Sequence, residues 1–254
     1  MRILITGAAR RIGAGIARRL ALRGHPVAIH HHHAAEDAEA LCRAIMESGG
    51  RASVLQGELA DPATAPALIA AARDALGGPI GGLVNNASQF AFDALPLTDF
   101  TLLDQHMRIN LGAPIALASA LAAQEDLDEG AVVNLLDQKV ANLNPDFLTY
   151  TLSKSALAAA TELLARGLAP RIRVNAVSPG LTLPSLDQTA EEFSRHARQN
   201  LLQRPVALDD IAATVEHLLT CSSITGQNVF VDCGQRFLPR EGDVMFEGRE
   251  RPDG

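Results

Sequence analysis

Directly after the apolar run Ile3-Leu4-Ile5, the chain reads Thr6-Gly7-Ala8-Ala9-Arg10-Arg11-Ile12-Gly13. A stretch of helical period over Ile12–Leu22 follows it. Gly7 permits a tight turn out of a strand, and Gly13 lets the following helix pack closely on a sheet. Backbone N–H groups at the start of that helix would point at the pyrophosphate of a dinucleotide. The stretch therefore predicts the first strand–turn–helix unit of a nucleotide-binding sheet.

Two arginines in this turn favour the same interpretation. Arg10 and Arg11 stand at the start of the helix, where the helix dipole repels cations unless an anion occupies the turn. We expect both guanidinium groups to contact phosphate; the alternative is that they are solvated, at a cost of about 0.3 kcal/mol. The cofactor-binding residues predicted in this turn are Gly7, Arg10, Arg11, Ile12 and Gly13.

The composition fits one large α/β domain, because 47% of the 254 residues are hydrophobic and can supply a sizeable core. A net charge of −7 argues against a nucleic-acid or anionic-membrane surface. The apolar runs are shorter than the ~18 residues that span a bilayer. The first run begins at Ile3, which leaves no room for a signal peptide. Three cysteines without metal-type spacing fit a reducing compartment, so we expect a cytoplasmic protein.

Short apolar runs alternate with longer stretches of helical period along most of the chain. The predicted strands are Arg2–Thr6, Pro26–His30, Ala52–Gln56, Gly82–Asn85, Ala131–Leu136, Ile172–Val177 and Val229–Val231. The predicted helices are Ile12–Leu22, Ala35–Ser48, Pro62–Leu76, Phe100–Ala122, Thr149–Leu168 and Leu208–Leu219. This alternation predicts an α/β protein with a single-domain Rossmann fold over residues 1–235, a doubly wound, seven-stranded parallel sheet with helices on both faces.

Two segments depart from this alternation. Residues 182–200 form a longer insertion, which we expect to close over the substrate as a lid. Residues 236–254 are polar and charged, and we expect a partly ordered C-terminal tail there.

The chain contains one tyrosine, Tyr150, and two lysines, Lys139 and Lys154. Lys154 follows Tyr150 by four residues, so on a helix the two side chains share a face with their Cβ atoms about 5–6 Å apart. A nearby cation favours the phenolate, and we expect Lys154 to lower the pKa of Tyr150 so that the phenol can act as an acid. The alternative is a coincidental surface pair.

A run of histidines, His30-His31-His32-His33, stands at the end of the second predicted strand. An NAD-selective site usually places an acidic residue near here, to bind the adenosine 2′-hydroxyl group. The first acidic residue in this segment is Glu36, so the segment favours NADPH over NADH. Neighbouring imidazoles point in opposite directions along an extended segment, and no Cys or carboxylate completes a ligand set, so we expect no metal site.

Further landmarks follow the first turn in order. They are Asn85-Asn86-Ala87-Ser88 after the fourth strand, Asn110 in the long helix, the pair Tyr150 and Lys154, Pro179-Gly180 after the sixth strand, and Val231-Asp232. With the first turn, they resemble the short-chain dehydrogenase/reductase family over the chain to about Gly234. That resemblance implies further cofactor-binding residues in the loops after the strands, with Tyr150 and Lys154 on a helix; the full set is His31, His32, His33, Glu58, Leu59, Asn86, Ala87, Ser88, Tyr150, Lys154, Pro179, Gly180 and Leu181.

A narrower resemblance concerns the pteridine reductase branch of that family, which includes bacterial dihydromonapterin reductases. Arg11 stands where ordinary members have a third glycine, and Asp137 stands where they have a serine, about 13 residues before the tyrosine. The segment 85–90 is similar to the one in that branch that carries a pterin-stacking aromatic residue, here Phe90. The chain departs from that branch at His33, which replaces an arginine, and at Glu58, which replaces an aspartate.

The resemblance implies hydride transfer from the nicotinamide of NADPH to an unsaturated carbon of the substrate. Tyr150 would donate the proton, Lys154 would hold the nicotinamide ribose, and Asn110 would anchor a water molecule. Asp137 separates substrate classes on physical grounds, because an ionised carboxylate only accepts hydrogen bonds whereas a serine hydroxyl can donate one. A carboxylate suits a ring with N–H donors or a basic nitrogen, as in a dihydropterin; the alternative is that Asp137 merely caps the loop after the fifth strand. The negative charge of Asp137 next to Tyr150 would raise the pKa of the tyrosine and so oppose Lys154, and the three groups should titrate as a coupled unit. The expected catalytic residues are Asp137, Tyr150, Lys154 and Asn110, and the expected substrate-binding residues are Ser88, Phe90, Asp137, Tyr150 and Leu181.

The predicted function is the NADPH-dependent reduction of a dihydropterin, such as dihydromonapterin, dihydrobiopterin or dihydrofolate, to its tetrahydro form. Two alternatives stay open: a short-chain reductase of a ketone or aldehyde, and a non-catalytic dinucleotide-binding or redox-sensing protein. The expected partner is a small pterin-like molecule, with neither nucleic acid nor a membrane. Related enzymes commonly assemble as tetramers, so the resemblance implies a homotetramer.

Overall fold

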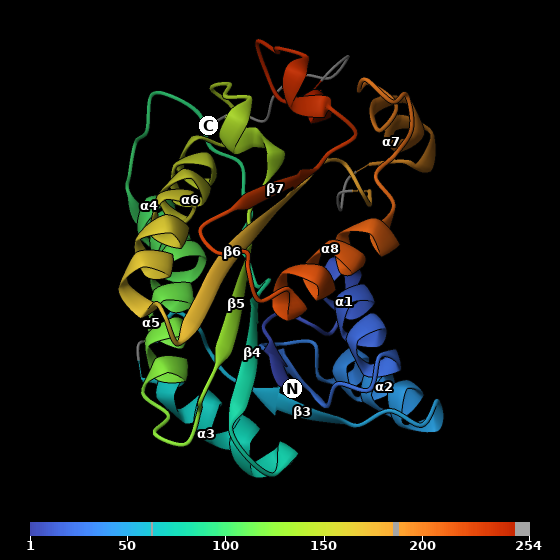
Figure 1. The fold of residues 1–254 in the computed structure, drawn as a ribbon. Helices are drawn as coiled ribbons and strands as arrows, with labels where there is room; N and C mark the ends of the chain where they lie inside the picture. Colours follow the sequence, from blue (N-terminus) through green and yellow to red (C-terminus); the bar gives the residue numbers. More distant parts are fainter. Residues whose placement is uncertain (62, 185–187, 247–254) are drawn as a thin grey trace.

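The computed structural model describes residues 1–61, 63–184 and 188–246. Within this part of the chain, parallel strands form one seven-stranded sheet in the order β3-β2-β1-β4-β5-β6-β7 (Figure 1). The strands are β1 (Arg2–Ile5), β2 (Val27–His31), β3 (Ala52–Gln56), β4 (Ile80–Asn85), β5 (Gly130–Leu135), β6 (Ile172–Pro179) and β7 (Asn228–Val231). The predicted doubly wound parallel sheet is confirmed.

Helices cover both faces of this sheet (Figure 1). One face carries α1 (Arg11–Leu22), α2 (Ala35–Glu47) and α8 (Leu208–Thr220). The other carries α3 (Thr64–Leu76), α5 (Ala113–Ala122) and α6 (Leu148–Leu168), with α4 (Thr101–His106) leading towards α5. Among the residues that the structure describes, no helix combines the length and apolar character needed to cross a membrane.

The central strand β1 supplies both cores, because successive side chains of a strand point to opposite faces of the sheet. Ile3 and Ile5 belong to the cluster under α1 and α8, together with Ile16 and Val215. Leu4, between them, belongs to the cluster under α3 and α5. Burial of each such side chain contributes about 2 kcal/mol. The apolar run at the start of the chain is therefore continuous because both faces of β1 are covered.

The chain reverses its progression across the sheet between β1 and β4. From β3, at one edge, it returns to form β4 on the other side of β1. The loops that follow β1 and β4 therefore diverge at the carboxyl edge of the sheet, which is where such folds bind ligands. The glycine-bearing turn and the segment Asn86-Ala87-Ser88 follow these two strands and meet at that edge.

The long helix predicted over Phe100–Ala122 is helical from Thr101 to Ala122, but it is not one uniform α-helix. A π-helical segment, Met107–Gly112, separates α4 from α5. Pro114 has no N–H group to donate to the carbonyl group of Asn110, four residues earlier, and this disfavours the α-helical pattern there. The other predicted boundaries lie within two residues of the observed ones. Pro62, the predicted start of α3, lies outside the described residues.

The insertion and the tail both contain regular structure. In the insertion, α7 (Ala190–His196) begins with a capping box between Thr189 and Glu192; residues 185–187 lie outside the described part, and closure as a lid stays a prediction. The predicted tail contains a short 3₁₀ turn over Val244–Phe246. Nδ2 of Asn142 donates to the carbonyl oxygen of Leu238 at 3.0 Å. Described residues of the tail therefore pack on the loop after β5.

Candidate functional site

The turn after β1 closely approaches the loop after β4. Gly7 has a φ of 59°, and a Cβ added to it would lie 2.8 Å from Cα of Ala87. A Cβ added to Gly13 would lie 2.5 Å from the carbonyl oxygen of Gly7 and 2.6 Å from Nδ2 of Asn86. Side chains at either position would push these segments apart. The packing roles predicted for both glycines are confirmed, whereas their contact with a pyrophosphate stays a prediction.

Hydrogen bonds join the two segments. Oγ1 of Thr6 accepts from the main-chain N–H groups of Asn86 and Ala87, each at 3.0 Å. Nδ2 of Asn86 donates to the carbonyl oxygens of Thr6 and Gly7, each at 2.9 Å. The two loops at the carboxyl edge of β1 and β4 are therefore held in place by the protein itself, so less ordering is needed when a ligand binds.

His30 supports the same turn. The N–H of Gly7 donates to Nδ1 of His30 at 3.2 Å, and Nε2 lies 3.1 Å from the carbonyl oxygen of Gly57. Nδ1 must accept while Nε2 donates, so the imidazole is neutral. Burial lowers the pKa of His30 to about 4, with smaller contributions from the neighbouring histidines, although the Gly57 carbonyl opposes the shift.

This neutral histidine makes part of the stability depend on pH. The pKa of His30 is about 4 in the folded protein and 6.5 in the unfolded chain, so the unfolded chain binds more protons between these values. The stability is fully present above pH ~6.5 and is lost, by about 2–3 kcal/mol, as the pH falls towards 4. Urea unfolding at about pH 7 and pH 4.5 should show a loss ~2 kcal/mol larger for wild type than for His30→Gln. The exposed His33→Gln serves as the control, and equal losses in all three chains would contradict the assignment.

The two arginines of the first turn have partners within the protein. Nη2 of Arg10 forms an ion pair with Oδ2 of Asp37 at 2.5 Å. Arg11 begins α1 with a φ of 54°, and its Nη1 donates to the carbonyl oxygen of Pro184 at 2.8 Å. Both arginines are exposed, and Arg11 connects the turn to the start of the insertion. Their predicted contacts with phosphate stay predictions.

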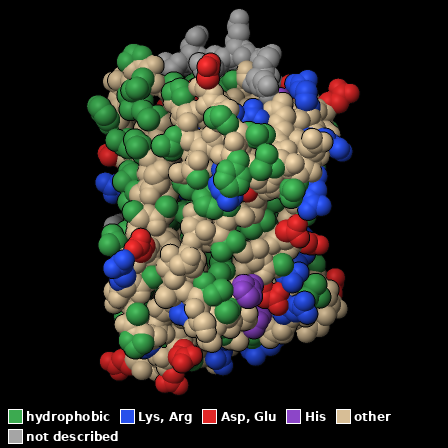
Figure 2. Space-filling model, turned by 45° about the horizontal axis from the view of Figure 1, so that its top comes forward, with side chains coloured by type: hydrophobic (Ala, Val, Ile, Leu, Met, Phe, Trp, Pro, Cys, Tyr) green, Lys and Arg blue, Asp and Glu red, His purple; other side chains and the backbone are tan. Residues whose placement is uncertain are grey.

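His32 and His33 reach the surface, whereas His31 is buried within β2. The ring centroids of His32 and His33 lie 3.5 Å apart. Nε2 of His32 lies 2.9 Å from Oε2 of Glu58, which comes from the loop after β3. Figure 2 shows histidine side chains beside acidic and basic ones at the surface. The structure thus brings together His32, His33 and Glu58 from the predicted cofactor set, but not the buried His31.

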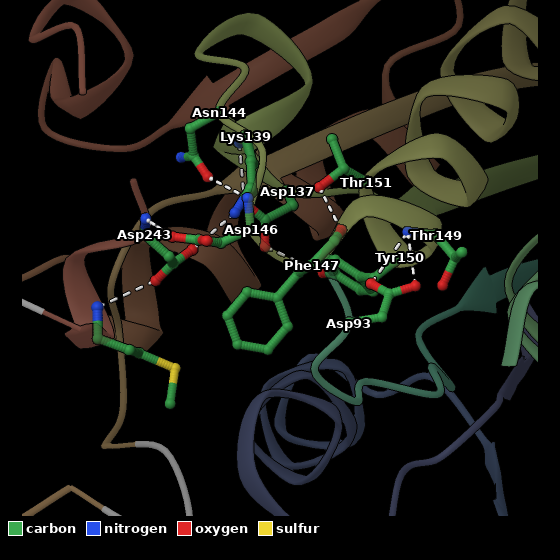
Figure 3. Close-up of polar contacts among 11 residues, drawn as sticks. Asp93, Asp137, Lys139, Asn144, Asp146, Phe147, Thr149, Tyr150, Thr151 and Asp243 are labelled. Atoms are coloured by element: carbon green, nitrogen blue, oxygen red, sulfur yellow. Dashed lines mark hydrogen bonds and ion pairs between the residues drawn. The ribbon is translucent and has the colours of Figure 1, made fainter. Parts of the chain in front are cut away.

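Asp137 and Tyr150 face each other at the carboxyl edge of β5 (Figure 3). Oη of Tyr150 donates to Oδ2 of Asp137 at 3.0 Å, and the N–H of Lys139 donates to Oδ1 at 2.8 Å. Asp137 caps the 3₁₀ turn Gln138–Ala141, and Tyr150 lies in the first turn of α6. Tyr150 is buried, whereas Asp137 is partly exposed, so the carboxylate is accessible to a ligand at this edge of the sheet.

Of the two opposing effects expected on the pKa of Tyr150, the structure shows the effect of Asp137 and not that of Lys154. Burial raises the pKa of Tyr150 well above that of free tyrosine, and the charge and hydrogen bond of Asp137 raise it further. Lys154 was expected to lower it, but its Nζ lies 5.8 Å from the ring centroid and donates to the carbonyl oxygen of Leu135 at 2.8 Å. That prediction is wrong, because the carboxylate contacts the hydroxyl directly while the ammonium does not. Burial lowers the pKa of Lys154 itself to about 8, against the charge of Asp137.

Asn110 joins the loop after β4 to α6. Its Oδ1 accepts from the N–H of Gln89 at 2.8 Å and from Oγ of Ser88 at 3.2 Å. Its Nδ2 donates to the carbonyl oxygen of Gln89 at 2.9 Å and to Oγ of Ser153 at 3.0 Å. The amide side chain is therefore fully used in positioning this loop, and the anchoring of a water molecule at Asn110 stays a prediction.

Phe90 extends from the loop after β4 towards Tyr150. Its side chain is 47% exposed; its ring stacks on Phe147, with centroids 4.4 Å apart, and meets the ring of Tyr150 edge-on at 4.8 Å. Phe147 also stacks on Phe246 at 5.7 Å, and its φ of 56° costs about 1 kcal/mol in a residue other than glycine. An aromatic wall thus borders the phenol, and the exposed ring of Phe90 can stack on a flat heterocycle.

The loop after β6 is positioned by residues near the end of the chain. The N–H of Gly180 donates to the carbonyl oxygen of Val231 at 3.0 Å, and the N–H of Leu181 donates to Oε1 of Gln235 at 3.0 Å. A Cβ on Gly180 would lie 2.7 Å from that amide oxygen, so glycine is required by the close approach. Pro179, Gly180 and the partly exposed Leu181 therefore lead from β6 into the insertion.

Sequence reasoning missed four residues that shape this site. Thr6 and His30 support the first turn, while Phe147 and Lys139 surround the Asp137–Tyr150 pair. The scarcity of lysine is a signal that could have singled out Lys139. The left-handed conformation of Phe147 has no signal in its residue type, because aromatic residues rarely adopt it.

The chain is similar to known proteins over most of its length. A family model described as enoyl-(acyl carrier protein) reductase matches residues 7–236. The crystal structure of FolM alternative dihydrofolate reductase 1 from Brucella suis, in complex with NADP, is 44% identical in sequence. The TM-score with that structure is 0.90, and the match covers 94% of this chain and 96% of that one.

Two further proteins show the range of activities among similar chains. A 3-oxoacyl-[acyl-carrier-protein] reductase from Staphylococcus aureus is 32% identical over 240 residues, which cover 91% of this chain and 96% of that protein. A blue fluorescent protein from a metagenomic library, whose structure is in complex with NADPH, is 31% identical with a TM-score of 0.83. That match covers 92% of this chain and 97% of that one.

Proposed function

We propose that this chain, which belongs to the short-chain dehydrogenase/reductase family, uses NADPH to reduce a dihydropterin to its tetrahydro form. The contact of 3.0 Å between the hydroxyl group of Tyr150 and the carboxylate of Asp137 carries this proposal. An ionised carboxylate only accepts hydrogen bonds, so it suits a ring that presents amino and N–H donors. The similar Brucella suis protein, described as an alternative dihydrofolate reductase, supports the same substrate class.

The start of α1 and the end of β2 suit a phosphorylated dinucleotide. Helix α1 has no side-chain cap at its start and no acidic residue in its first turn, so its first N–H groups remain suited to an anion. Arg10 and Arg11 add positive charge at this point in a chain of net charge −7. His32 and His33 lie at the surface after β2, near where a 2′-phosphate would bind. The similar structures in complex with NADP and NADPH support the same cofactor.

The chemistry divides between cofactor and protein. NADPH, when bound, supplies the hydride. Tyr150 keeps its proton at neutral pH, because its pKa is raised by burial and by Asp137, and it can donate that proton to the substrate. Asp137 accepts hydrogen bonds from the amino-pyrimidine edge of the ring. Lys154, fixed by the carbonyl group of Leu135, places a cation behind the phenol and stabilises the phenolate once the proton has left.

Arg11→Gly is expected to weaken NADPH binding about tenfold and NADH binding much less, because a charge-assisted hydrogen bond contributes ~1.5–3 kcal/mol. The same change removes the strain of a φ of 54°, so Tm should not fall. Calorimetric Kd values for both cofactors, measured beside Tm, test this. Arg18→Ala, which removes a charge from an exposed position of the same helix, is the control. Equal losses for both cofactors would place Arg11 on phosphates that NADPH and NADH share.

Turnover of two substrate panels tests the proposed function. The chain with NADPH is supplied with dihydromonapterin, dihydrobiopterin and dihydrofolate, and in parallel with ketones, aldehydes and a 3-oxoacyl thioester. We expect the highest kcat/KM with a dihydropterin. Turnover of carbonyl compounds alone would overturn the proposal and favour a ketone reductase, the candidate that the Staphylococcus aureus protein supports. NADPH binding without turnover of either class would favour a dinucleotide-binding or redox-sensing protein.

Three expectations about the setting of the reaction stay predictions. They are the domain boundary at residue 235, assembly into a homotetramer, and a location in the cytoplasm. The contact between Asn142 and Leu238 shows that part of the chain beyond residue 235 packs on the body of the protein.

A further inference from the structure

Lys139 connects the C-terminal segment to the candidate catalytic carboxylate (Figure 3). Its Nζ forms an ion pair with Oδ2 of Asp243 at 2.8 Å, and its side chain is only 4% exposed. The same Nζ lies 5.1 Å from the centroid of the Phe147 ring. Its main-chain N–H donates to Oδ1 of Asp137 at 2.8 Å. One residue therefore contacts the C-terminal segment through its side chain and Asp137 through its main chain.

Asp243 is itself held in place. Its N–H donates to Oδ2 of Asp146 at 2.7 Å, and its Oδ1 accepts from the N–H of Met245 at 3.0 Å. Phe246, one residue further, stacks on Phe147 and meets Phe92 edge-on at 4.9 Å. The segment is thus attached by polar and aromatic contacts beside the phenol, and Asp243 cannot move without disturbing them.

The charges of Lys139 and Asp243 affect the pKa values of the neighbouring Asp137 and Tyr150. Burial raises the pKa of Asp137 most, the charge of Asp243 raises it further, and the charge of Lys139 lowers it. After burial and Asp137, the charge of Asp243 also raises the pKa of Tyr150. Lys154 of α6 also interacts with the charge of Asp137. The cost of desolvating a buried ion pair offsets much of the attraction between its charges. A contribution to folding stability therefore does not by itself explain why this pair lies here.

We propose that the C-terminal segment Leu238–Phe246 forms part of the proton-donating site, and that Lys139 and Asp243 are positioning residues that hold Asp137 against the hydroxyl group of Tyr150. Asp243 fixes the side chain of Lys139, and Lys139 belongs to the 3₁₀ turn that Asp137 caps by accepting the N–H of Lys139. For its catalytic consequence the inference rests on the proposed function. The contacts that carry it do not depend on the identity of the substrate.

Two single substitutions test the proposal, because they should act in opposite directions. Asp243→Asn leaves the charge of Lys139 unbalanced, so the pKa values of Asp137 and Tyr150 should fall. Lys139→Gln leaves Asp243 unbalanced, so both pKa values should rise. The alkaline limb of kcat/KM for the dihydropterin should move by about one pH unit down in the first variant and up in the second.

Two further variants serve as controls. Asp243→Glu keeps the negative charge and should give the wild-type pH profile. Asp126→Asn, which breaks the distant ion pair with Arg73, should leave the profile unchanged.

A spectroscopic measurement needs no substrate. The chain has one tyrosine and no tryptophan, so the ultraviolet absorbance of phenolate reports on Tyr150 alone. Tyr150 should ionise at lower pH in Asp243→Asn than in wild type, and at higher pH in Lys139→Gln. If one of the two single variants fails to fold, the other single variant is compared with the double variant Lys139→Gln/Asp243→Asn. The double variant leaves no unpaired charge.

The outcomes separate this proposal from the proposed function. Shifts of opposite sign in the two variants support the positioning role. Equal shifts, or none, overturn it, because a merely structural defect would affect both variants alike. A wild-type chain that reduces no dihydropterin would overturn the proposed function, while the titration of Tyr150 would still decide the role of Lys139 and Asp243.

Discussion

Tyr150→Phe is expected to reduce kcat for dihydropterin reduction by about 10²–10⁴-fold, the range in which a positioned proton donor contributes. The substitution removes the hydroxyl group that bonds to Asp137 but keeps the ring that contacts Phe90 edge-on at 4.8 Å. The aromatic wall is therefore preserved, and the loss concerns proton transfer. Single-turnover measurements at saturating NADPH give the rate of the chemical step directly.

The affinity for NADPH serves as the control for this variant. It should change little, since the first turn and the loop after β4 are held by Thr6 and Asn86, whose contacts do not involve Tyr150. Because the tyrosine hydroxyl lowers the pKa of Asp137, the pKa of Asp137 should rise further in Tyr150→Phe. A variant that keeps the wild-type kcat would contradict the role of Tyr150 as proton donor.

Asp137→Ser is expected to lower kcat/KM for a dihydropterin by about 10²–10³-fold, because hydrogen bonds to a charged acceptor contribute ~1.5–3 kcal/mol each. Asp137 caps the turn after β5, and serine is also a good cap, so the local fold should survive. The affinity for NADPH should again change little. Steady-state kinetics and Kd values, measured on the same preparation, separate the two effects.

The same variant distinguishes the two candidate substrate classes. A serine hydroxyl can donate a hydrogen bond to a carbonyl oxygen, which an ionised carboxylate cannot. Turnover of ketones by Asp137→Ser should therefore rise relative to turnover of dihydropterins. Unchanged kinetics with dihydropterins would contradict a role of Asp137 in substrate binding and would weaken the proposal of a pterin substrate.

Much of the fold was predictable because its determinants are local. The apolar residues Ile3, Leu4 and Ile5 make up most of β1, and the glycines that follow permit the turn at its end. Short apolar runs and helical periods place the strands and most helices to within two residues. The helix interruption at Met107–Gly112 was not predicted, because hydrophobic period does not reveal which helical hydrogen bonds a proline removes further along the chain.

The candidate site was predictable only in part. Spacing in the sequence brings Tyr150 and Lys154 onto one helix face, and Asp137 stands at the end of a strand. Spacing indicates that Asp137 and Lys154 act on the pKa of Tyr150 in opposite directions, but it does not show which of them contacts the hydroxyl group, so the net direction stays open. That direction depends on distances of a few ångströms between separate elements and on burial.

The residues of the first turn and their order relative to Asp137, Tyr150 and Lys154 by themselves determined the fold, the glycine requirements and the class of chemistry to expect. Tertiary structure alone decided which charges act on the proton. Lys139 and Asp243 are 104 positions apart, yet their side chains meet at 2.8 Å beside Asp137. The reason is physical: periodicity and turn chemistry act between neighbours in the chain, whereas electrostatic interactions depend on distance in space and on exclusion of water.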